Sequence, residues 1–130
     1  MKRLIAVALA SLLFAVTASI AAQQKPSPTV AVAATGNSVA ATVSDQPGRA
    51  PFFLFFDKQG AFIEAVSNPA KDAGTPGPAM VDFLAAKAIK VVVAGAFGPP
   101  MVDALKSKGI RHIEINGNAK DAAKKALELK

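Results

Sequence analysis

Short apolar runs alternate with clusters of turn-forming residues along the chain, and the runs follow two different periods. Runs rich in β-branched or aromatic residues and bounded by Gly, Pro, Asn or Asp predict strands at 29–34, 52–57, 61–66, 89–94 and 110–115. Segments with apolar residues at helical spacing predict helices at 79–88, 100–108 and 119–129. The resulting order, β-β-β-α-β-α-β-α, predicts an α/β fold in which helices pack on a mixed sheet.

Several of these elements supply the expected core. The strand at 52–57 places phenylalanines on both of its faces, so we expect both sides of the sheet to be buried. The segment 57–60 is polar and ends in glycine, which predicts a hairpin turn. The run 89–94 is apolar enough for a central strand. The helix at 79–88 has one apolar stripe, made of Met80, Phe83, Leu84 and Ala88.

The N-terminus has the pattern of a secretory signal peptide. Lys2 and Arg3 precede an uncharged apolar run that ends at Ala22, and small residues at 19 and 21 fit a cleavage site after Ala21. The basic pair lacks the two arginines of a twin-arginine signal, which predicts export of an unfolded chain. An uncleaved membrane anchor is the alternative, because the run approaches the roughly 20 residues that span a bilayer.

This pattern sets the expected domain organisation. Residues 1–21 form the signal peptide, residues 22–28 a short polar tether and residues 29–130 a single domain. We expect the mature protein to be periplasmic or secreted, with no membrane contact after cleavage. Loss of the basic pair lowers the formal net charge from +6 to +4. The remaining basic residues are scattered and lack interleaved aromatic residues, so we expect a solvated helical face and no nucleic-acid partner.

Composition excludes several kinds of chemistry. The 130 residues contain no Cys, which excludes disulfides, Cys-ligated zinc or iron–sulfur sites and thiol nucleophiles. The one histidine, His112, excludes a multi-histidine metal site, and we interpret it as a structural or surface residue. The first and fourth predicted strands lack the carboxylates that a magnesium-dependent nuclease or ATPase requires. A small hydrolase would need a nucleophile–base–acid set that is missing, so we expect a protein that is not an enzyme.

Two glycine-rich turns precede helices and are the first candidates for a ligand site. They span 73–78 and 94–100, and each has proline where the first helical turn begins. A helix N-terminus presents unpaired N–H groups and a partial positive charge, so it attracts anions. The second turn follows a central parallel strand, which places it in the crevice at the carboxyl end of the sheet. Two ordinary turns without a ligand are the alternative.

The third candidate is the loop 46–51, which precedes the phenylalanine-rich strand. Arg49 lies there beside Gly48, and a guanidinium is a common partner for oxyanionic or large soft ligands. A surface salt bridge is the alternative role for this arginine. The three segments give one set of candidate cofactor-binding residues: Gln46, Gly48, Arg49, Gly74, Thr75, Gly77, Gly95, Phe97 and Gly98.

Short motifs follow one another in order along the chain from Thr29 to Ile110. The segments are Thr29–Ala33, Gly48–Leu54, Asn68–Ala70, Val91–Gly95 with Gly98-Pro99, Ala104-Leu105 and Gly109-Ile110. Together they resemble the dinitrogenase iron–molybdenum cofactor biosynthesis family, which includes NifX-type domains, the C-terminal part of NifB and orange protein. The resemblance extends from about Pro28 to Leu129. It implies a ribonuclease-H-like α/β fold with a five-stranded mixed sheet, whose first, fourth and fifth strands are parallel and central.

The resemblance also implies a function. Family members bind, carry or store metal–sulfur clusters, and the site would be the crevice shared by the three loops. Many members have histidine at the position of Gln46 and a His-Gly pair at 73–74, where this chain has Ala73-Gly74. Because these histidines are missing, orange protein is the better comparison within the family. The resemblance to orange protein implies non-covalent binding of an anionic molybdenum–copper sulfide.

The expected function is that of a carrier outside the cytoplasm. We expect an anionic metal–sulfur cluster, a Mo–Cu or Mo–Fe sulfide, held by backbone amides, Arg49 and apolar walls. Its partner is then an inorganic thiometallate or cluster, loaded after export. Met80, Met101 and the aliphatic surface could support a homo-oligomer or a protein partner. The alternative is an apo interaction module of the same fold that has lost cluster binding.

Overall fold

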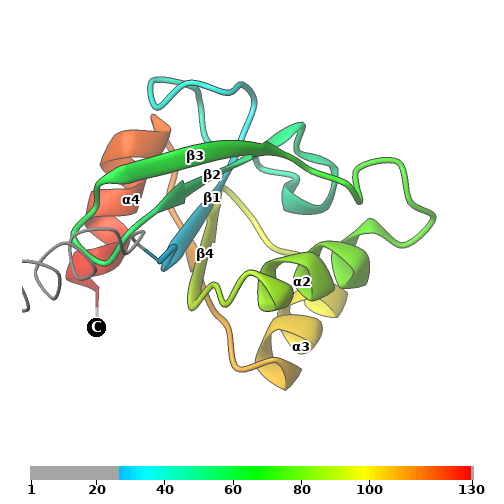
Figure 1. The fold of residues 1–130 in the computed structure, drawn as a ribbon. Coiled ribbons are helices and arrows are strands. Elements are labelled where there is room, and N and C mark those ends of the chain that lie inside the picture. The colour runs from blue at the N-terminus through cyan, green and yellow to red at the C-terminus, as the bar shows by residue number, and fades with distance from the viewer. Residues whose placement is uncertain (1–26, 130) are drawn as a thin grey trace, which may run out of the picture.

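The computed structural model describes residues 27–129, and these residues form a five-stranded mixed sheet with the strand order β3-β2-β1-β4-β5 (Figure 1). The strands are β1 (Val30–Ala34), β2 (Phe52–Phe56), β3 (Phe62–Ser67), β4 (Val91–Ala94) and β5 (Arg111–Glu114). β1 and β4 are parallel, as are β4 and β5, whereas β2 pairs antiparallel with both β1 and β3. The predicted fold class is confirmed. The predicted signal peptide and residues 22–26 of the tether lie outside the described residues.

The position of the fifth strand differs from the expectation. β5 is parallel but lies at one edge of the sheet, and the central strands are β2, β1 and β4. Its burial agrees with this position, because Arg111 and Glu114 are exposed and the two residues between them are half-buried. β1 and β4, in contrast, are fully buried along their length, as their uninterrupted apolar sequences require.

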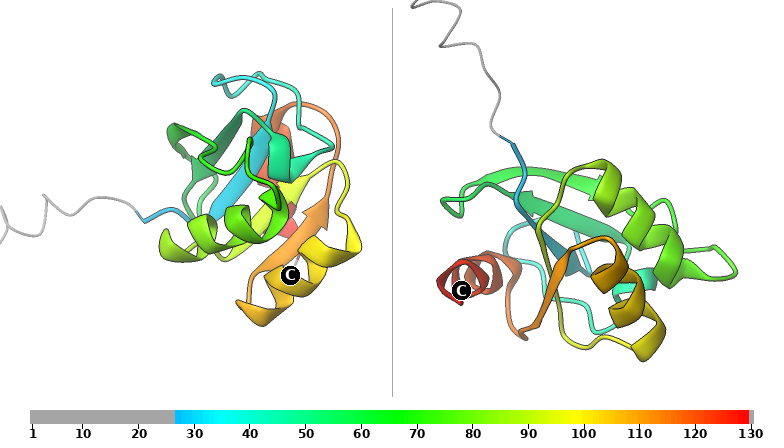
Figure 2. Two further views of the ribbon diagram at one scale, coloured as in Figure 1. Left: turned by 90° about the vertical axis from the view of Figure 1, so that its right-hand side faces the viewer. Right: turned by 90° about the horizontal axis from the view of Figure 1, so that it is seen from below.

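Helices cover both faces of the sheet (Figure 2). α2 (Pro76–Ala86) and α3 (Pro99–Ser107) lie on one face, and α4 (Ala119–Glu128) lies on the other. Alternation along β2 divides the core between these layers, since Phe53 and Phe55 join the α2/α3 layer while Leu54 and Phe56 join the α4 layer. The expectation that this strand is buried on both faces is confirmed. No helix within residues 27–129 is long and apolar enough to cross a bilayer.

α2 begins earlier than its sequence pattern suggests. It was expected at 79–88, but it starts at Pro76 and includes two prolines in its first turn. Proline is tolerated there because the first N–H groups of a helix have no acceptor within the helix. The other end also differs, since Ala88 has a φ of 61° and is exposed rather than part of the apolar stripe. Val81, which is 1% exposed, is buried there with Met80 and Leu84.

Candidate functional site

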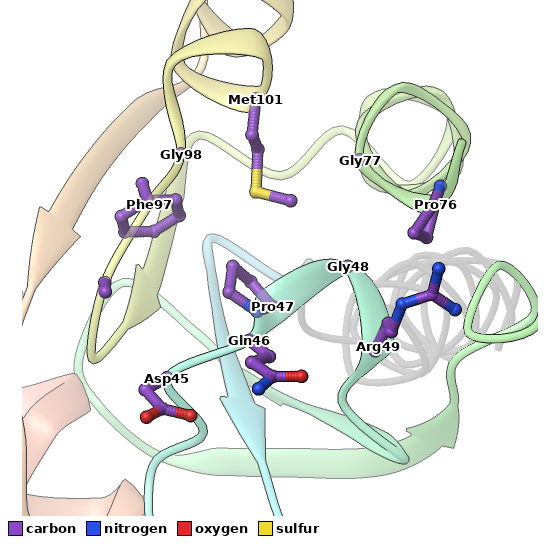
Figure 3. A pocket seen from close by; sticks show the side chains of 11 residues that line it. Asp45, Gln46, Pro47, Gly48, Arg49, Pro76, Gly77, Phe97, Gly98 and Met101 are labelled. Atoms are coloured by element: carbon purple, nitrogen blue, oxygen red, sulfur yellow. The ribbon is translucent and has the colours of Figure 1, made fainter. Parts of the chain in front are cut away.

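One pocket lies where the three candidate segments meet, at the carboxyl ends of the parallel strands β1 and β4 (Figure 3). Its volume is about 460 Å³, within the range of roughly 300–1,000 Å³ that is typical of small-molecule sites. A short 3₁₀ helix, η1 (Pro47–Arg49), forms one wall, and the first turns of α2 and α3 form the others. The lining residues are Asp45, Gln46, Pro47, Gly48, Arg49, Pro76, Gly77, Ala96, Phe97, Gly98 and Met101.

Close backbone packing holds these walls together. A Cβ atom on Gly48 would lie 3.2 Å from the amide nitrogen of Gly77 and 3.3 Å from Cε of Met101. At these distances a side chain at position 48 would force its neighbours to move by a few tenths of an ångström, so glycine favours the close approach of η1 to α2. A Cβ atom on Gly95 would lie 2.7 Å from Oδ1 of Asn116 and 3.2 Å from Cβ of Asp45. Gly95 therefore brings the loop at 44–45 against the end of β4 without lining the pocket.

The pocket has one positive and one negative side chain. Arg49 is exposed, and its Nη1 donates a hydrogen bond to the carbonyl oxygen of Lys71 at 3.1 Å. Asp45 is also exposed and lies at the opposite end of the lining (Figure 3). The formal charges of the lining cancel, so an anion would be attracted to the Arg49 end.

The remaining wall is apolar and soft. The thioether of Met101 projects toward the pocket between Gly77 and Gly98 (Figure 3). Thioether sulfur is polarizable, which strengthens dispersion contacts with large polarizable ligands. Phe97 adds a half-buried ring.

β5 fixes the loop that presents Phe97. The ring of His112 meets the Phe97 ring edge to face, with centroids 5.2 Å apart. Oε2 of Glu114, on the same face of β5, accepts a hydrogen bond from the Phe97 amide at 3.1 Å. His112 thus lies behind the pocket wall rather than in the lining, in keeping with the structural role expected for it.

Backbone donors are fewer than the two helix N-termini suggest. Prolines at 76 and 78 in α2, and at 99 and 100 in α3, remove four of the N–H groups that a helix N-terminus would otherwise present. Within residues 27–129, the amides of five lining residues donate no hydrogen bond to a protein atom: Asp45, Gly48, Gly77, Ala96 and Gly98. These five amides are the backbone donors that remain for a ligand.

The structure brings six of the nine candidate residues to the pocket: Gln46, Gly48, Arg49, Gly77, Phe97 and Gly98. Three do not line it. Gly74 is exposed with open space around it, Thr75 is the exposed residue before α2, and Gly95 packs against neighbouring loops.

Five lining residues were not among the candidates predicted from the sequence: Asp45, Pro47, Pro76, Ala96 and Met101. Met80 and Met101 were expected to support self-association or a partner contact, but both are buried in the core, with exposed fractions of 0% and 8%. A signal for Met101 existed in the spacing, because it follows Gly98 by three residues and so completes the first turn of α3.

Residues 27–129 contain no group of three or more His, Cys, Asp or Glu side chains that could hold a metal ion.

Comparisons with known proteins agree with this architecture. The structure of the apo form of orange protein from Desulfovibrio gigas superposes with a TM-score of 0.71 at 25% identity, covering 81% of this chain and 91% of that one. A putative NifB protein from Thermotoga, assigned to the DUF35 family, superposes with a TM-score of 0.66 at 27% identity, covering 78% and 89%. No curated protein sequence matches the chain significantly.

The sequence alone assigns the chain to a family. Residues 28–129 match the family model described as dinitrogenase iron-molybdenum cofactor, which spans the whole domain and every segment that lines the pocket. The motifs quoted above fall on β1, on η1 with β2, on β4 and on the start of α3, and three of their residues, Gly48, Arg49 and Gly98, also line the pocket. This chain therefore belongs to the dinitrogenase iron-molybdenum cofactor family.

Proposed function

We propose that this protein is an exported, non-enzymatic carrier that binds an anionic metal–sulfur cluster containing molybdenum in the pocket between η1, α2 and α3. The observation that supports this most is the composition of the lining: a guanidinium at the end away from the Asp45 carboxylate, a thioether, apolar rings and a few free amides, in a family associated with the iron-molybdenum cofactor. Such a lining fits a cargo that already has its sulfide ligands. The proposal includes a Mo–Cu or Mo–Fe sulfide as cargo.

The shortage of donors supports a thioanion over an oxyanion. Small oxyanions at helix N-termini are held by several convergent N–H groups, and four of those groups are absent here because the residues are prolines. Sulfide-rich anions are larger and more polarizable, so dispersion contacts with the apolar rings and the Met101 side chain favour them. We expect tetrathiomolybdate to bind and molybdate to bind weakly or not at all.

Export would determine when the cargo is loaded. Gln46–Arg49, Gly77 and Gly98 come together only in the folded chain, so a non-covalent cluster would not survive passage of an unfolded chain. Loading would then follow export, with thiometallate taken up outside the cytoplasm.

A titration tests this proposal. Protein without residues 1–21 is mixed with tetrathiomolybdate together with copper(I) or iron(II), and visible absorption and retained molybdenum are measured after desalting. We expect colourless protein to gain charge-transfer bands and to retain molybdenum, with molybdate as the matched control. An unchanged thiometallate spectrum, with all metal removed by desalting, would contradict it.

The second candidate function is an apo interaction module, and two observations favour it. Gln46 and Ala73 occupy positions where family members have histidine, and Asp45 opposes the charge of Arg49. This alternative predicts no thiometallate uptake, so the same titration separates the two functions.

A further inference from the structure

Asn68 is a buried polar residue that holds the backbone on both sides of Arg49, and all of its side-chain groups are engaged. It is 2% exposed and lies in the loop after β3. Its Nδ2 donates hydrogen bonds to the carbonyl oxygens of Gly48 and Ala50, each at 3.0 Å. Its Oδ1 accepts a hydrogen bond from the Ala70 amide at 2.9 Å. Burial of an amide is tolerated when its donors and acceptor are satisfied, as they are here.

The two carbonyl groups that Asn68 holds come one residue before and one residue after Arg49. They belong to segments 18 and 20 residues away in sequence, so the contact is tertiary. Because one buried side chain holds both carbonyl groups, the backbone between them cannot rotate freely. The direction in which the Arg49 side chain leaves the backbone is thereby set.

The same loop also holds the end of that side chain. The Lys71 carbonyl, three residues after Asn68, accepts a hydrogen bond from Nη1 of Arg49 at 3.1 Å. The loop itself is closed by the bond from the Ala73 amide to the Ala70 carbonyl at 3.0 Å. An arginine side chain has many rotamers, so an anion binds it more tightly when its orientation is fixed beforehand.

We propose that Asn68 is the positioning residue of Arg49, and that it raises the affinity of the pocket for an anion by orienting the guanidinium through the 68–71 loop. The inference rests on the proposed function for its binding readout. It also makes a statement about the free protein, namely that the order of the Arg49 side chain depends on Asn68.

Two measurements on the purified protein test this proposal. The first is the NMR order parameter of the Arg49 Nε–H bond without ligand, in the unmodified protein, in Asn68→Ala and in Asn68→Ser, which keeps one donor. We expect it to fall in Asn68→Ala and to fall less in Asn68→Ser. Asn118→Ala is the matched control, because it removes an asparagine with a similar number of hydrogen bonds on the other face of the sheet.

The second measurement is a double-mutant cycle on tetrathiomolybdate affinity. We expect Asn68→Ala to weaken binding about tenfold when Arg49 is present and less than twofold in the Arg49→Ala background, since both residues act through one network. If Asn68→Ala does not fold, Asn68→Ser gives the same cycle with a smaller effect.

The outcomes separate this inference from the proposed function. An unchanged Arg49 order parameter, or equal losses of affinity in both backgrounds, would overturn the positioning role. If the unmodified protein binds no thiometallate but the order parameter falls in both Asn68 variants, the positioning role stands and the proposed cargo is wrong.

Discussion

The N-terminus of α4 and the N-termini of α2 and α3 are built in opposite ways. Asn118 caps α4, its Oδ1 accepting a hydrogen bond from the Asp121 amide at 2.9 Å. The next two amides, of Ala119 and Lys120, donate to the carbonyl groups of Ala41 and Val39. Thr75 before α2 makes no side-chain cap hydrogen bond, and Gly98 before α3 has no side chain that could make one.

This difference in capping indicates different roles for the N-terminus of α4 and for the N-termini of α2 and α3. The α4 end is satisfied by its own chain and serves stability, because capped N–H groups need no other partner. The ends of α2 and α3 face the pocket and rely on prolines rather than capping side chains. N–H groups without a partner in the chain therefore remain at the pocket ends of α2 and α3, where a ligand could accept their hydrogen bonds. The first three residues of α4 offer no such groups to a ligand, because their amides already donate within the chain. The following changes test this contrast.

The largest effect should come from filling the pocket. We predict that Gly98→Val abolishes thiometallate binding while the protein stays folded. Gly98 has φ −78° and ψ 157°, which valine adopts readily, and a Cβ atom there would meet only Cδ of Pro100 at 3.9 Å. The measurements are desalting-retained molybdenum and thermal unfolding. Gly74→Val is the matched control, because Gly74 is surrounded by open space outside the pocket; equal binding by both variants would contradict the prediction.

Removal of the pocket cation should have the next largest effect. We predict that Arg49→Ala weakens thiometallate binding roughly tenfold to a hundredfold, the range expected for a charge-assisted contact. Arg49→Lys should lose less, because it keeps the charge without the planar fork. Isothermal titration at two salt concentrations measures both variants. Unchanged affinity in folded Arg49→Ala would place the anion elsewhere.

The opposite result is expected at the α4 end. Asn118→Ala should lower the free energy of unfolding by about 1 kcal/mol, the usual loss for an N-cap asparagine, and leave thiometallate affinity unchanged. Denaturant unfolding and the visible titration measure the two quantities. A loss of affinity without a loss of stability would reverse the roles assigned to the two ends.

The smallest effect should come from the pocket carboxylate. Asp45→Asn removes the negative charge at the pocket end opposite Arg49 and should tighten thiometallate binding about twofold to fivefold at low salt. The gain should shrink as salt rises, because both charged residues are exposed and are screened. Titration across ionic strengths measures it, and weaker binding by Asp45→Asn would contradict an anionic cargo, because removal of a like charge cannot weaken its binding.

The succession of strands and helices could be predicted from the sequence, because periodicity depends on local patterns, whereas the edge position of β5 depends on tertiary pairing and was predicted wrongly. Phe53, Phe55, Leu54 and Phe56 divide between the two core layers as their alternation requires. The start of α2 could not be located from apolar spacing, since its first turn is Pro76-Gly77-Pro78 and contributes little to the stripe. That shift of three residues decides which glycine reaches the pocket, and it favours Gly77 over Gly74.

Pocket composition was harder to predict than the fold. Arg49 and Gly98 were identified because charge and glycine stand out in a sequence. Met101 was not identified as a lining residue, and Asn68 was noted only as part of a motif, because their contributions depend on tertiary contacts with Gly48, far away in the chain. Such contacts are set by how η1 packs against α2, α3 and the loop after β3, and no local pattern indicates them.

Chemical-shift mapping tests the central claim most directly. The amide spectrum of isotope-labelled protein is recorded during addition of tetrathiomolybdate with copper(I). Shifts should concentrate on Gly48, Arg49, Gly77 and Gly98 and on the methyl group of Met101, with the residues of α4 unchanged. Shifts centred on α4 or the β2–β3 hairpin, or a spectrum unchanged at saturating thiometallate, would contradict the assignment of this pocket as the cargo site.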